Sequence, residues 1–278
     1  RVIMKKFNLK LLYLISIQLF FSYSVMAATC KQTVPDSALV KKGTLVMSTN
    51  PTLPPLQFVD STGKLKGMRI TLGKEVAKRL CLKPEYISIE FSAMIPGLQA
   101  GRWDLINTGI FWNTKRAAMM NMIPYESAAI SISVKKGNPL GISKEDDLAG
   151  KAVGVEIGGL EEKKLKEIDQ NLRAKGLTPI NIRVFDNFAL AYQALRAGQT
   201  DASVAIDATA AEYVKRGEFD RAISGMFPMP VALAMKNDIL AKTVLEAMND
   251  MMEDGFYQEL MDEYGLLPNS SPFIIRGS

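Results

Sequence analysis

Residues 101–116 read GRWDLINTGIFWNTKR, and this stretch decides how the rest of the chain is interpreted. Residues 103–106 are apolar enough for a short buried strand, with Asp104 as its one charge. The Asn-Thr-Gly sequence at 107–109 then breaks the run. Because glycine has no Cβ, Gly109 lets the backbone approach a neighbouring group closely. The pattern predicts a strand that ends in a small polar turn.

A helix start follows this turn. Asn113 is suited to cap the helix, and Arg116 falls in its first turn. Free N–H groups and a guanidinium fork converge where such a strand ends beside such a helix, and this arrangement suits a carboxylate. Taken alone, the stretch also fits a surface arginine beside a packed turn.

The stretch resembles the GRxDxIxxGxxxTxxR segment of the polar amino-acid binding proteins of ABC importers, the family 3 solute-binding proteins. The resemblance continues in the family's order at residues 91–98 (FSAMIPGL), 124–125 (PY), 150–155 (GKAVGV) and 198–202 (GQTDA). It covers almost all of the chain after residue 40. Each piece is weak alone, whereas their order and spacing together are specific.

The expected fold class is α/β, because strand patterns alternate with helix patterns and favour mostly parallel sheets flanked by helices. The resemblance implies the two-lobe, type II periplasmic-binding-protein fold, in which two hinge crossovers let the lobes close on a ligand like a Venus flytrap. It places lobe 1 at residues 38–129, lobe 2 at 130–230 and a return to lobe 1 at 231–278. The run at 128–134 is expected to be a strand that leaves lobe 1.

The first residues are interpreted as a targeting signal. A basic start at 4–10, an apolar segment at 11–25 and small residues near 28 are typical of a secretory signal peptide, expected to span residues 1–28. A membrane anchor is the alternative, but the apolar run is short for a span. Cleavage removes four of the 34 basic residues and leaves 30 against 29 acidic ones. We expect a periplasmic protein of a Gram-negative bacterium with no nucleic-acid partner.

The chain has two cysteines, Cys30 and Cys81, and no histidine. An oxidising compartment permits the two cysteines to form a disulfide, and two unpaired thiols are the alternative. Two cysteines without histidine do not favour zinc, so we expect neither a metal nor a cofactor.

A zwitterionic ligand needs a cation for its carboxylate and an anion for its ammonium group. The resemblance implies that Arg116 binds the carboxylate, helped by Thr108 and by the backbone around Gly159 and Leu160. It assigns the ammonium group to Asp207. The family's DAxxxD spacing before this aspartate is one residue longer here. On a strand, one extra residue reverses the direction of a side chain unless a bulge absorbs it.

Further expected contacts depart from the family pattern. Asn50 and Leu53, on the loop that rims the cleft, replace an acid and a stacking aromatic that many relatives carry. Phe111 stands where relatives usually have serine or threonine, two positions after Gly109, which is also an expected contact. Phe91 falls where an apolar side chain packs on the ligand, with a core phenylalanine as the alternative. The pocket keeps its guanidinium, loses hydroxyls and gains apolar bulk.

Two charged residues depart from the pattern as well. Glu156 lies where some relatives place an apolar residue against the ligand. If its carboxylate points into the cleft it needs a partner, because a bare buried charge is costly, and a cationic ligand tail would provide one. A solvated glutamate is the alternative. Arg69 and Thr71 replace acids of the family's first helix, and we interpret them as variation on the helix surface.

These observations predict a monomeric receptor that binds a polar amino acid or derivative and delivers it to an ABC permease in the inner membrane. The aromatic and acidic positions favour basic, modified or ring-containing amino acids over glutamate and aspartate. The alternative is a periplasmic enzyme on the same scaffold, similar to cyclohexadienyl dehydratases, whose strand-to-helix turn also contains a Gly-Gly pair. An elimination needs a poised acid or base, and only Glu156, Glu161 or Glu162 would serve. We therefore expect a binding protein with no catalytic residue.

Overall fold

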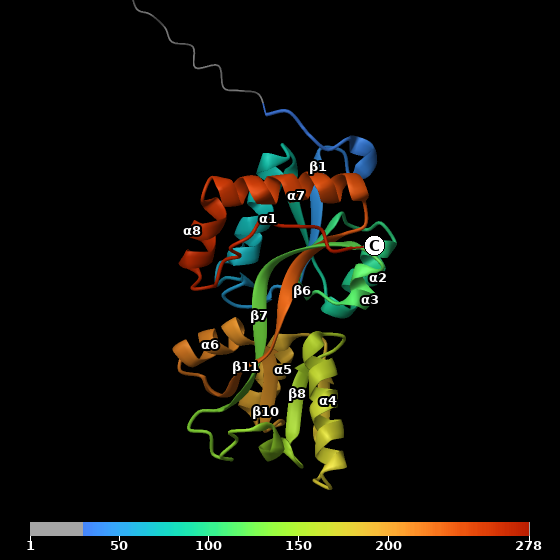
Figure 1. The fold of residues 1–278 in the computed structure, drawn as a ribbon. Coiled ribbons are helices and arrows are strands. Elements are labelled where there is room, and N and C mark those ends of the chain that lie inside the picture. Colours follow the sequence, from blue (N-terminus) through green and yellow to red (C-terminus); the bar gives the residue numbers. More distant parts are fainter. Residues whose placement is uncertain (1–29, 278) are drawn as a thin grey trace, which may run out of the picture. The chain divides into compact units, whose positions relative to one another are not determined.

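The computed structural model describes residues 30–277, so the predicted signal peptide lies outside the described residues. From Lys31 onward the chain forms a unit of its own, which holds every helix and strand named below (Figure 1). Cys30 and Cys81 are both disulfide-bonded, which confirms the predicted disulfide.

An eight-stranded sheet forms the centre of this unit. Its strands are parallel neighbours at both ends and antiparallel neighbours in the middle. Three of its strands, β1 (Thr44–Thr49), β6 (Leu105–Phe111) and β10 (Ala202–Ile206), are buried at every residue, as expected for strands covered on both faces. The order is β5 (Lys83–Ser88), β1 (Thr44–Thr49), β6 (Leu105–Phe111), β11 (Phe219–Met235), β7 (Asn121–Lys135), β10 (Ala202–Ile206), β8 (Ala152–Glu156) and β9 (Asn181–Phe185).

The two long strands β7 and β11 join the upper and lower parts of the sheet (Figure 1). Residues 231–235 of β11 pair with β6, whereas residues 130–134 of β7 pair with β10. β7 is longer than the strand expected at 128–134, because its first half pairs with β11, which comes much later in the sequence. The ladder between β7 and β11 is bulged at several points, and bulges bend and twist a ribbon.

This arrangement confirms the predicted α/β fold with two lobes and two hinge crossovers. The exact lobe boundaries stay a prediction. The helices of lobe 1 are α1 (Met68–Arg79), α2 (Phe91–Gln99), α3 (Thr114–Ala117), α7 (Asp238–Glu253) and α8 (Phe256–Glu263), and those of lobe 2 are α4 (Leu160–Ala174), α5 (Phe188–Ala197) and α6 (Asp207–Lys215).

Local sequence signals set several helix ends. The side chains of Asn113, Asn187 and Asn237 each accept a hydrogen bond from a backbone N–H in the first turn of α3, α5 and α7. Gly198 ends α5 in the left-handed conformation that glycine adopts at little cost. Two of these caps, those of α3 and α5, belong to helices whose first turns line the space between the lobes.

A small sheet lies on the rim of lobe 1. It consists of β2 (Thr52–Leu53), β3 (Gln57–Val59) and β4 (Leu65–Lys66). The strand β2 follows Asn50 and contacts α5 of lobe 2. Two single turns of 3-10 helix, Asp36–Ala38 and Glu145–Leu148, complete the elements. Within residues 30–277 no helix is both long enough and apolar enough to cross a membrane.

Candidate functional site

A small cavity lies between the two lobes and is lined by most of the predicted ligand contacts. Nine of the eleven predicted contacts line it, and Arg116 and Asp207 do not. Three further residues that were not predicted as contacts complete the lining. The full set is Asn50, Leu53, Phe91, Thr108, Gly109, Phe111, Glu156, Gly159, Leu160, Glu161, Phe188 and Ile206.

The cavity is nearly filled by its own side chains. Its volume is about 10 Å³, close to the smallest space that holds one water molecule. An amino acid therefore enters only if the lobes move apart or the lining side chains rearrange. The bulged ribbon of β7 and β11 is the segment about which such a movement would take place.

Hydrogen bonds cross directly from one lobe to the other. The amide Nδ2 of Asn50 donates to Oε1 of Glu156 over 2.6 Å. The side chain of Asn187, the cap of α5, donates to Glu90 over 3.1 Å. These contacts place the ends of strands β1 and β8 against each other across the cavity.

The strand that was expected to end at residues 107–109 instead continues to Phe111 as β6, and its pairing with β11 shifts register at this point. This bulge at Thr108 and Gly109 is held in place from the rim. The backbone N–H of Asn50 donates to Oγ1 of Thr108 over 2.9 Å. The amide of Gln57 on β3 donates to the Thr108 carbonyl over 2.7 Å. The position of this wall of the cavity is therefore set by side-chain contacts as well as by the β6 ladder.

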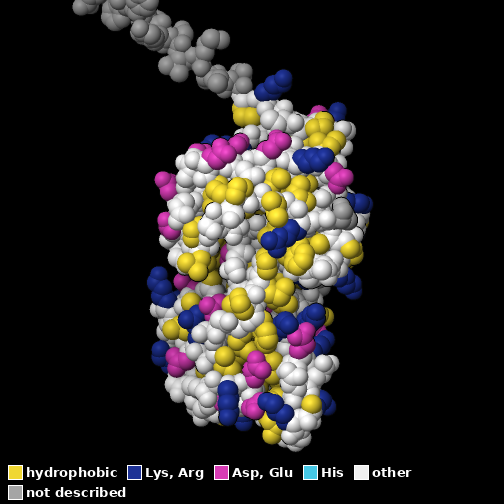
Figure 2. All heavy atoms as spheres, viewed as in Figure 1, with side chains coloured by type: hydrophobic (Ala, Val, Ile, Leu, Met, Phe, Trp, Pro, Cys, Tyr) yellow, Lys and Arg dark blue, Asp and Glu magenta, His cyan; other side chains and the backbone are white. Residues whose placement is uncertain are grey.

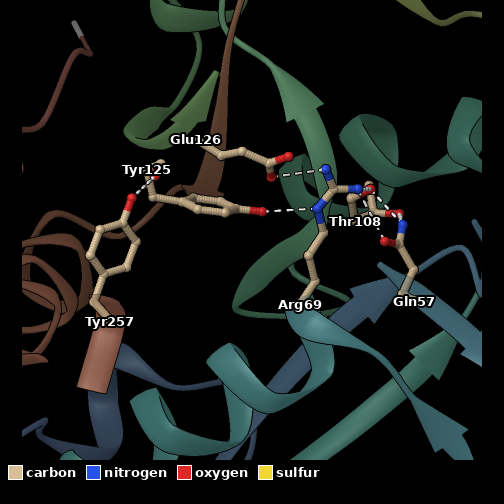
Figure 3. Close-up of polar contacts among 6 residues, drawn as sticks. All are labelled: Gln57, Arg69, Thr108, Tyr125, Glu126 and Tyr257. Carbon is tan, nitrogen blue, oxygen red and sulfur yellow. Dashed lines mark hydrogen bonds and ion pairs between the residues drawn. The ribbon is translucent and has the colours of Figure 1, made fainter. Parts of the chain in front are cut away.

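Arg69 lies against the same bulge of β6 and is fully buried (Figure 3). Its Nη1 donates to Oε1 of Gln57 (3.0 Å) and to the Thr108 carbonyl (3.1 Å). Its Nε donates to the Tyr125 hydroxyl (3.0 Å), and its Nη2 forms an ion pair with Glu126 (3.1 Å). The interpretation of Arg69 as helix-surface variation is wrong, because its side chain points from α1 toward the hinge strand β7, where its acidic partner lies.

Gly109 makes room for this guanidinium. A Cβ at Gly109 would lie 2.1 Å from Nη1 of Arg69, and the residue has a φ of +85°, a region that favours glycine. Burial lowers the pKa of Arg69, but Tyr125 and Glu126 outweigh burial and raise it above the usual arginine value. Arg69 therefore stays charged and connects the cavity wall to the hinge.

Arg116 lies beyond the end of β6, on α3. Its backbone N–H donates to Oδ1 of Asn113 over 2.9 Å, which is the predicted helix cap. Its Nη1 donates to the Phe111 carbonyl (2.8 Å), its Nη2 to the Gly158 carbonyl (3.4 Å), and its guanidinium lies 5.3 Å from the centre of the Phe91 ring. Among the described residues it forms no ion pair. Burial lowers its pKa, and the nearby carboxylate of Glu161 opposes that shift.

Two carboxylates point into the cavity region from lobe 2, and both are buried. Glu156 ends β8 and is 3% exposed, so it is not the solvated glutamate that was the alternative. Burial, together with Glu161 and Glu90, raises its pKa well above the usual value. Burial also raises the pKa of Glu161, in the first turn of α4, although its own N–H and Arg116 favour the charged form.

Asp207 points away from the cavity. It accepts a hydrogen bond from Ser131 and forms an ion pair with Arg221 at 3.0 Å. Ile206 lines the cavity in its stead. The longer spacing along β10 explains this exchange, because one additional residue on a strand turns the next side chain to the opposite face.

A wider groove opens beside Arg116 and adjoins the cavity. It has a volume of about 740 Å³ and shares Gly159 and Leu160 with the cavity lining. In Figure 2, dark blue basic side chains lie beside yellow apolar ones where the two lobes meet. The charged residues that line the groove are Lys115, Arg116, Glu162, Lys163, Lys164 and Lys166.

The sequence offered partial signals for the residues that were missed. Glu161 was noted only as a potential acid or base. Phe188 follows Asn187, a recognisable helix cap, so its place at the start of α5 could have been found. Arg69 had no local signal, since Glu126 lies 57 positions away. Among residues 30–277 no group of three or more acidic or cysteine side chains is placed to hold a metal ion.

Comparison with known proteins agrees with this architecture. The family model of the bacterial extracellular solute-binding proteins, family 3, matches residues 45–266. The L-cystine-binding protein TcyJ of Escherichia coli (strain K12) is 29% identical over 250 residues, which cover 87% of this chain and 91% of that protein.

Two solved structures are similar as well. An ancestral arginine-binding protein bound to arginine superposes with a TM-score of 0.74 at 33% identity, covering 80% of this chain and 98% of its own. The ancestral amino acid-binding protein AncCDT-1, a precursor of cyclohexadienyl dehydratase, gives a TM-score of 0.71 at 29% identity, covering 80% and 95%.

Proposed function

Because the chain belongs to the bacterial extracellular solute-binding proteins of family 3, we propose that it is the receptor of an ABC importer for a polar amino acid or amino-acid derivative. It binds this ligand between its lobes, as a monomer in the periplasm, and delivers it to a permease in the inner membrane. The observation that carries the proposal is the interlobe cavity, where nine predicted contacts from both lobes meet. Beside it lies a buried arginine that forms no ion pair with any residue in the described part of the chain.

Each part of the ligand has a suitable partner in this region. Arg116 keeps donors that its two carbonyl contacts do not use, and these suit a carboxylate. Phe91 and Phe188 offer apolar surface to a side chain. Glu156 and Glu161 suit a cationic or hydrogen-bond-donating group, because a partner would relieve the cost of burying their charges.

Closure of the lobes would complete the site. When the lobes separate about β7 and β11, Glu156 and Glu161 withdraw from Phe91 and Thr108, and the ligand gains access. Closing on a bound ligand excludes water, which strengthens every charged contact inside. A closed, loaded form is also the form that a permease would distinguish from the open one.

A thermal-shift screen of the mature protein tests this function. A ligand that binds the folded form raises the melting temperature by mass action. Basic, modified or ring-containing amino acids should give larger shifts than glutamate and aspartate. Larger shifts with the acidic amino acids would contradict the specificity, and no shift with any amino acid or derivative would contradict the proposed function itself.

A second candidate is an elimination enzyme, favoured by two buried carboxyl groups of raised pKa in the cleft, since such groups can act as general acids. Turnover of a cyclohexadienyl carboxylate, followed by the ultraviolet absorbance of the aromatic product, distinguishes it from a receptor. A receptor leaves the absorbance unchanged, whereas product formation that stops in the Glu156→Gln and Glu161→Gln variants would establish the enzyme.

A further inference from the structure

Two amide–carboxylate pairs connect the lobes and run in opposite directions across the space between them. Asn50 of lobe 1 donates from Nδ2 to Oε1 of Glu156 in lobe 2 over 2.6 Å. Asn187 of lobe 2 donates from Nδ2 to Oε1 of Glu90 in lobe 1 over 3.1 Å. Asn50 and Glu156 were both predicted to contact a ligand, and in the structure they contact each other.

The lobe that carries each asparagine also orients its amide group. Oδ1 of Asn50 accepts from Oγ1 of Thr52 over 2.9 Å, and the backbone N–H of Asn50 donates to Thr108. Oδ1 of Asn187 accepts from the backbone N–H of Leu190 over 3.0 Å, which is the cap of α5. Because each amide oxygen is held within its own lobe, the NH2 group is directed at the glutamate of the other lobe. Little side-chain freedom is therefore lost when the lobes meet.

Apolar side chains from both lobes fill the space beside the first pair. Asn50 and Glu156 line the cavity, whose volume is about 10 Å³. A space that holds about one water molecule does not admit an amino acid. These contacts and a bound amino acid therefore exclude each other. The buried apolar residues of the lining belong to one hydrophobic cluster and are Leu53 and Phe111 of lobe 1 and Leu160, Phe188 and Ile206 of lobe 2.

We infer that the two pairs form a latch, by which the protein closes on its own side chains in competition with the solute that it binds. A solute enters only after the lobes have separated and both amides have left their glutamates. The apparent affinity is therefore reduced by the fraction of the protein that is open. The competition rests on the proposed receptor function, whereas the latch itself is tested without any solute.

Small-angle X-ray scattering tests whether the wild-type mature protein is latched. Bound solute is first removed by unfolding in guanidinium chloride and refolding with the disulfide kept oxidised. The radius of gyration should then match the value calculated from residues 30–277 of this structure. A larger radius, with the lobes apart, would overturn the latch and leave the receptor function standing.

Hydrogen exchange at pH 8 measures how strongly the second pair holds the lobes, since opening exposes the buried backbone amides of residues 160–161. Asn187→Asp keeps an oxygen that caps α5 but places a carboxylate against that of Glu90, so these amides should exchange about tenfold faster. Asn237→Asp makes the same change at the cap of α7, whose described contact lies within lobe 1, and should leave the rate unchanged. A wild-type rate in Asn187→Asp would overturn the latch.

Exchanging the two groups of a pair tests whether the hydrogen bond itself holds the lobes. In Asn187→Asp combined with Glu90→Gln, the amide donates to the carboxylate in the reverse direction, and the amides should return to near the wild-type rate. Asn50→Asp and its combination with Glu156→Gln make the same comparison at the cavity. Exchange that stays fast in both combined variants would show that the pairs do not act through this bond and would overturn the latch. If the latch holds but no amino acid of the thermal-shift screen binds, the receptor function fails and the latch stands.

Discussion

Two buried arginines donate to carbonyl groups of β6, Arg69 to Thr108 and Arg116 to Phe111, but their other partners differ. Arg69 donates hydrogen bonds to the side chains of Gln57, Tyr125 and Glu126 and to the Thr108 carbonyl. The protein itself therefore supplies both a negative charge and the hydrogen-bond acceptors for this guanidinium. Arg116 is also buried, but the described hydrogen-bond acceptors of its side chain are two backbone carbonyls. A buried arginine with its own carboxylate holds the fold together, whereas one without a carboxylate is available to a ligand.

The pKa directions agree with this difference. The pKa of Arg69 is raised, because Tyr125 and Glu126 outweigh the effect of burial. The pKa of Arg116 is lowered, because burial dominates and Glu161 compensates only in part. A ligand carboxylate bound at Arg116 would supply the negative charge that Glu126 supplies at Arg69.

The largest expected effect is the loss of folding stability when Arg69 is replaced. Arg69→Met leaves Glu126 buried without a cation and should lower the free energy of unfolding by about 3–5 kcal/mol. Urea unfolding of the ligand-free protein measures it. The double variant Arg69→Met with Glu126→Gln should recover part of the loss, because no bare charge remains. A loss below about 1 kcal/mol for the single variant would contradict the structural role.

The next effect is on binding at Arg116. For the amino acid that gives the largest thermal shift, Arg116→Ala should weaken the binding free energy by about 2–5 kcal/mol. The reason is that the ligand carboxylate loses its partner in a dry cleft. Calorimetry measures the affinity. Arg116→Lys should restore it only in part, since an ammonium group lacks the fork geometry. Unchanged affinity in the alanine variant would remove Arg116 from the site.

The comparison also shows which parts of the site could be predicted from the sequence. Arg116 and Thr108 belong to one continuous strand and helix, so their pattern was visible locally, although the strand does not end at the Asn-Thr-Gly sequence. Arg69 was misread because its partner Glu126 is on a hinge strand far along the chain, and only the fold brings the two together.

The remaining differences have physical causes of the same kind. The strands and most helices followed from alternating apolar patterns, whereas the full length of β7 depends on a non-local partner, β11. The added residue before Asp207 was visible, but whether a bulge absorbs it is decided by the pairing of β10 with β7. The direction of Glu161 depends on Gly159, since a side chain there would occupy the place of its carboxylate.

The smallest expected effect concerns the pH dependence of stability and tests whether Glu161 is a partner of Arg116 in the way that Glu126 is of Arg69. Burial raises the pKa of Glu161 in the folded protein above the 4.5 of the unfolded chain. Between these two values the folded state binds more protons than the unfolded state, so this group's contribution to stability falls as pH rises through the window. In the Glu161→Gln variant this position has no proton to lose in that pH window. The melting temperature of the variant minus that of the wild type, both measured without ligand, should therefore increase as the pH is raised from 4.5 to 8. An ion pair with Arg116 would lower the pKa of Glu161 and reverse the sign, so a difference that decreases with pH would show that the protein already neutralises Arg116 with its own carboxylate.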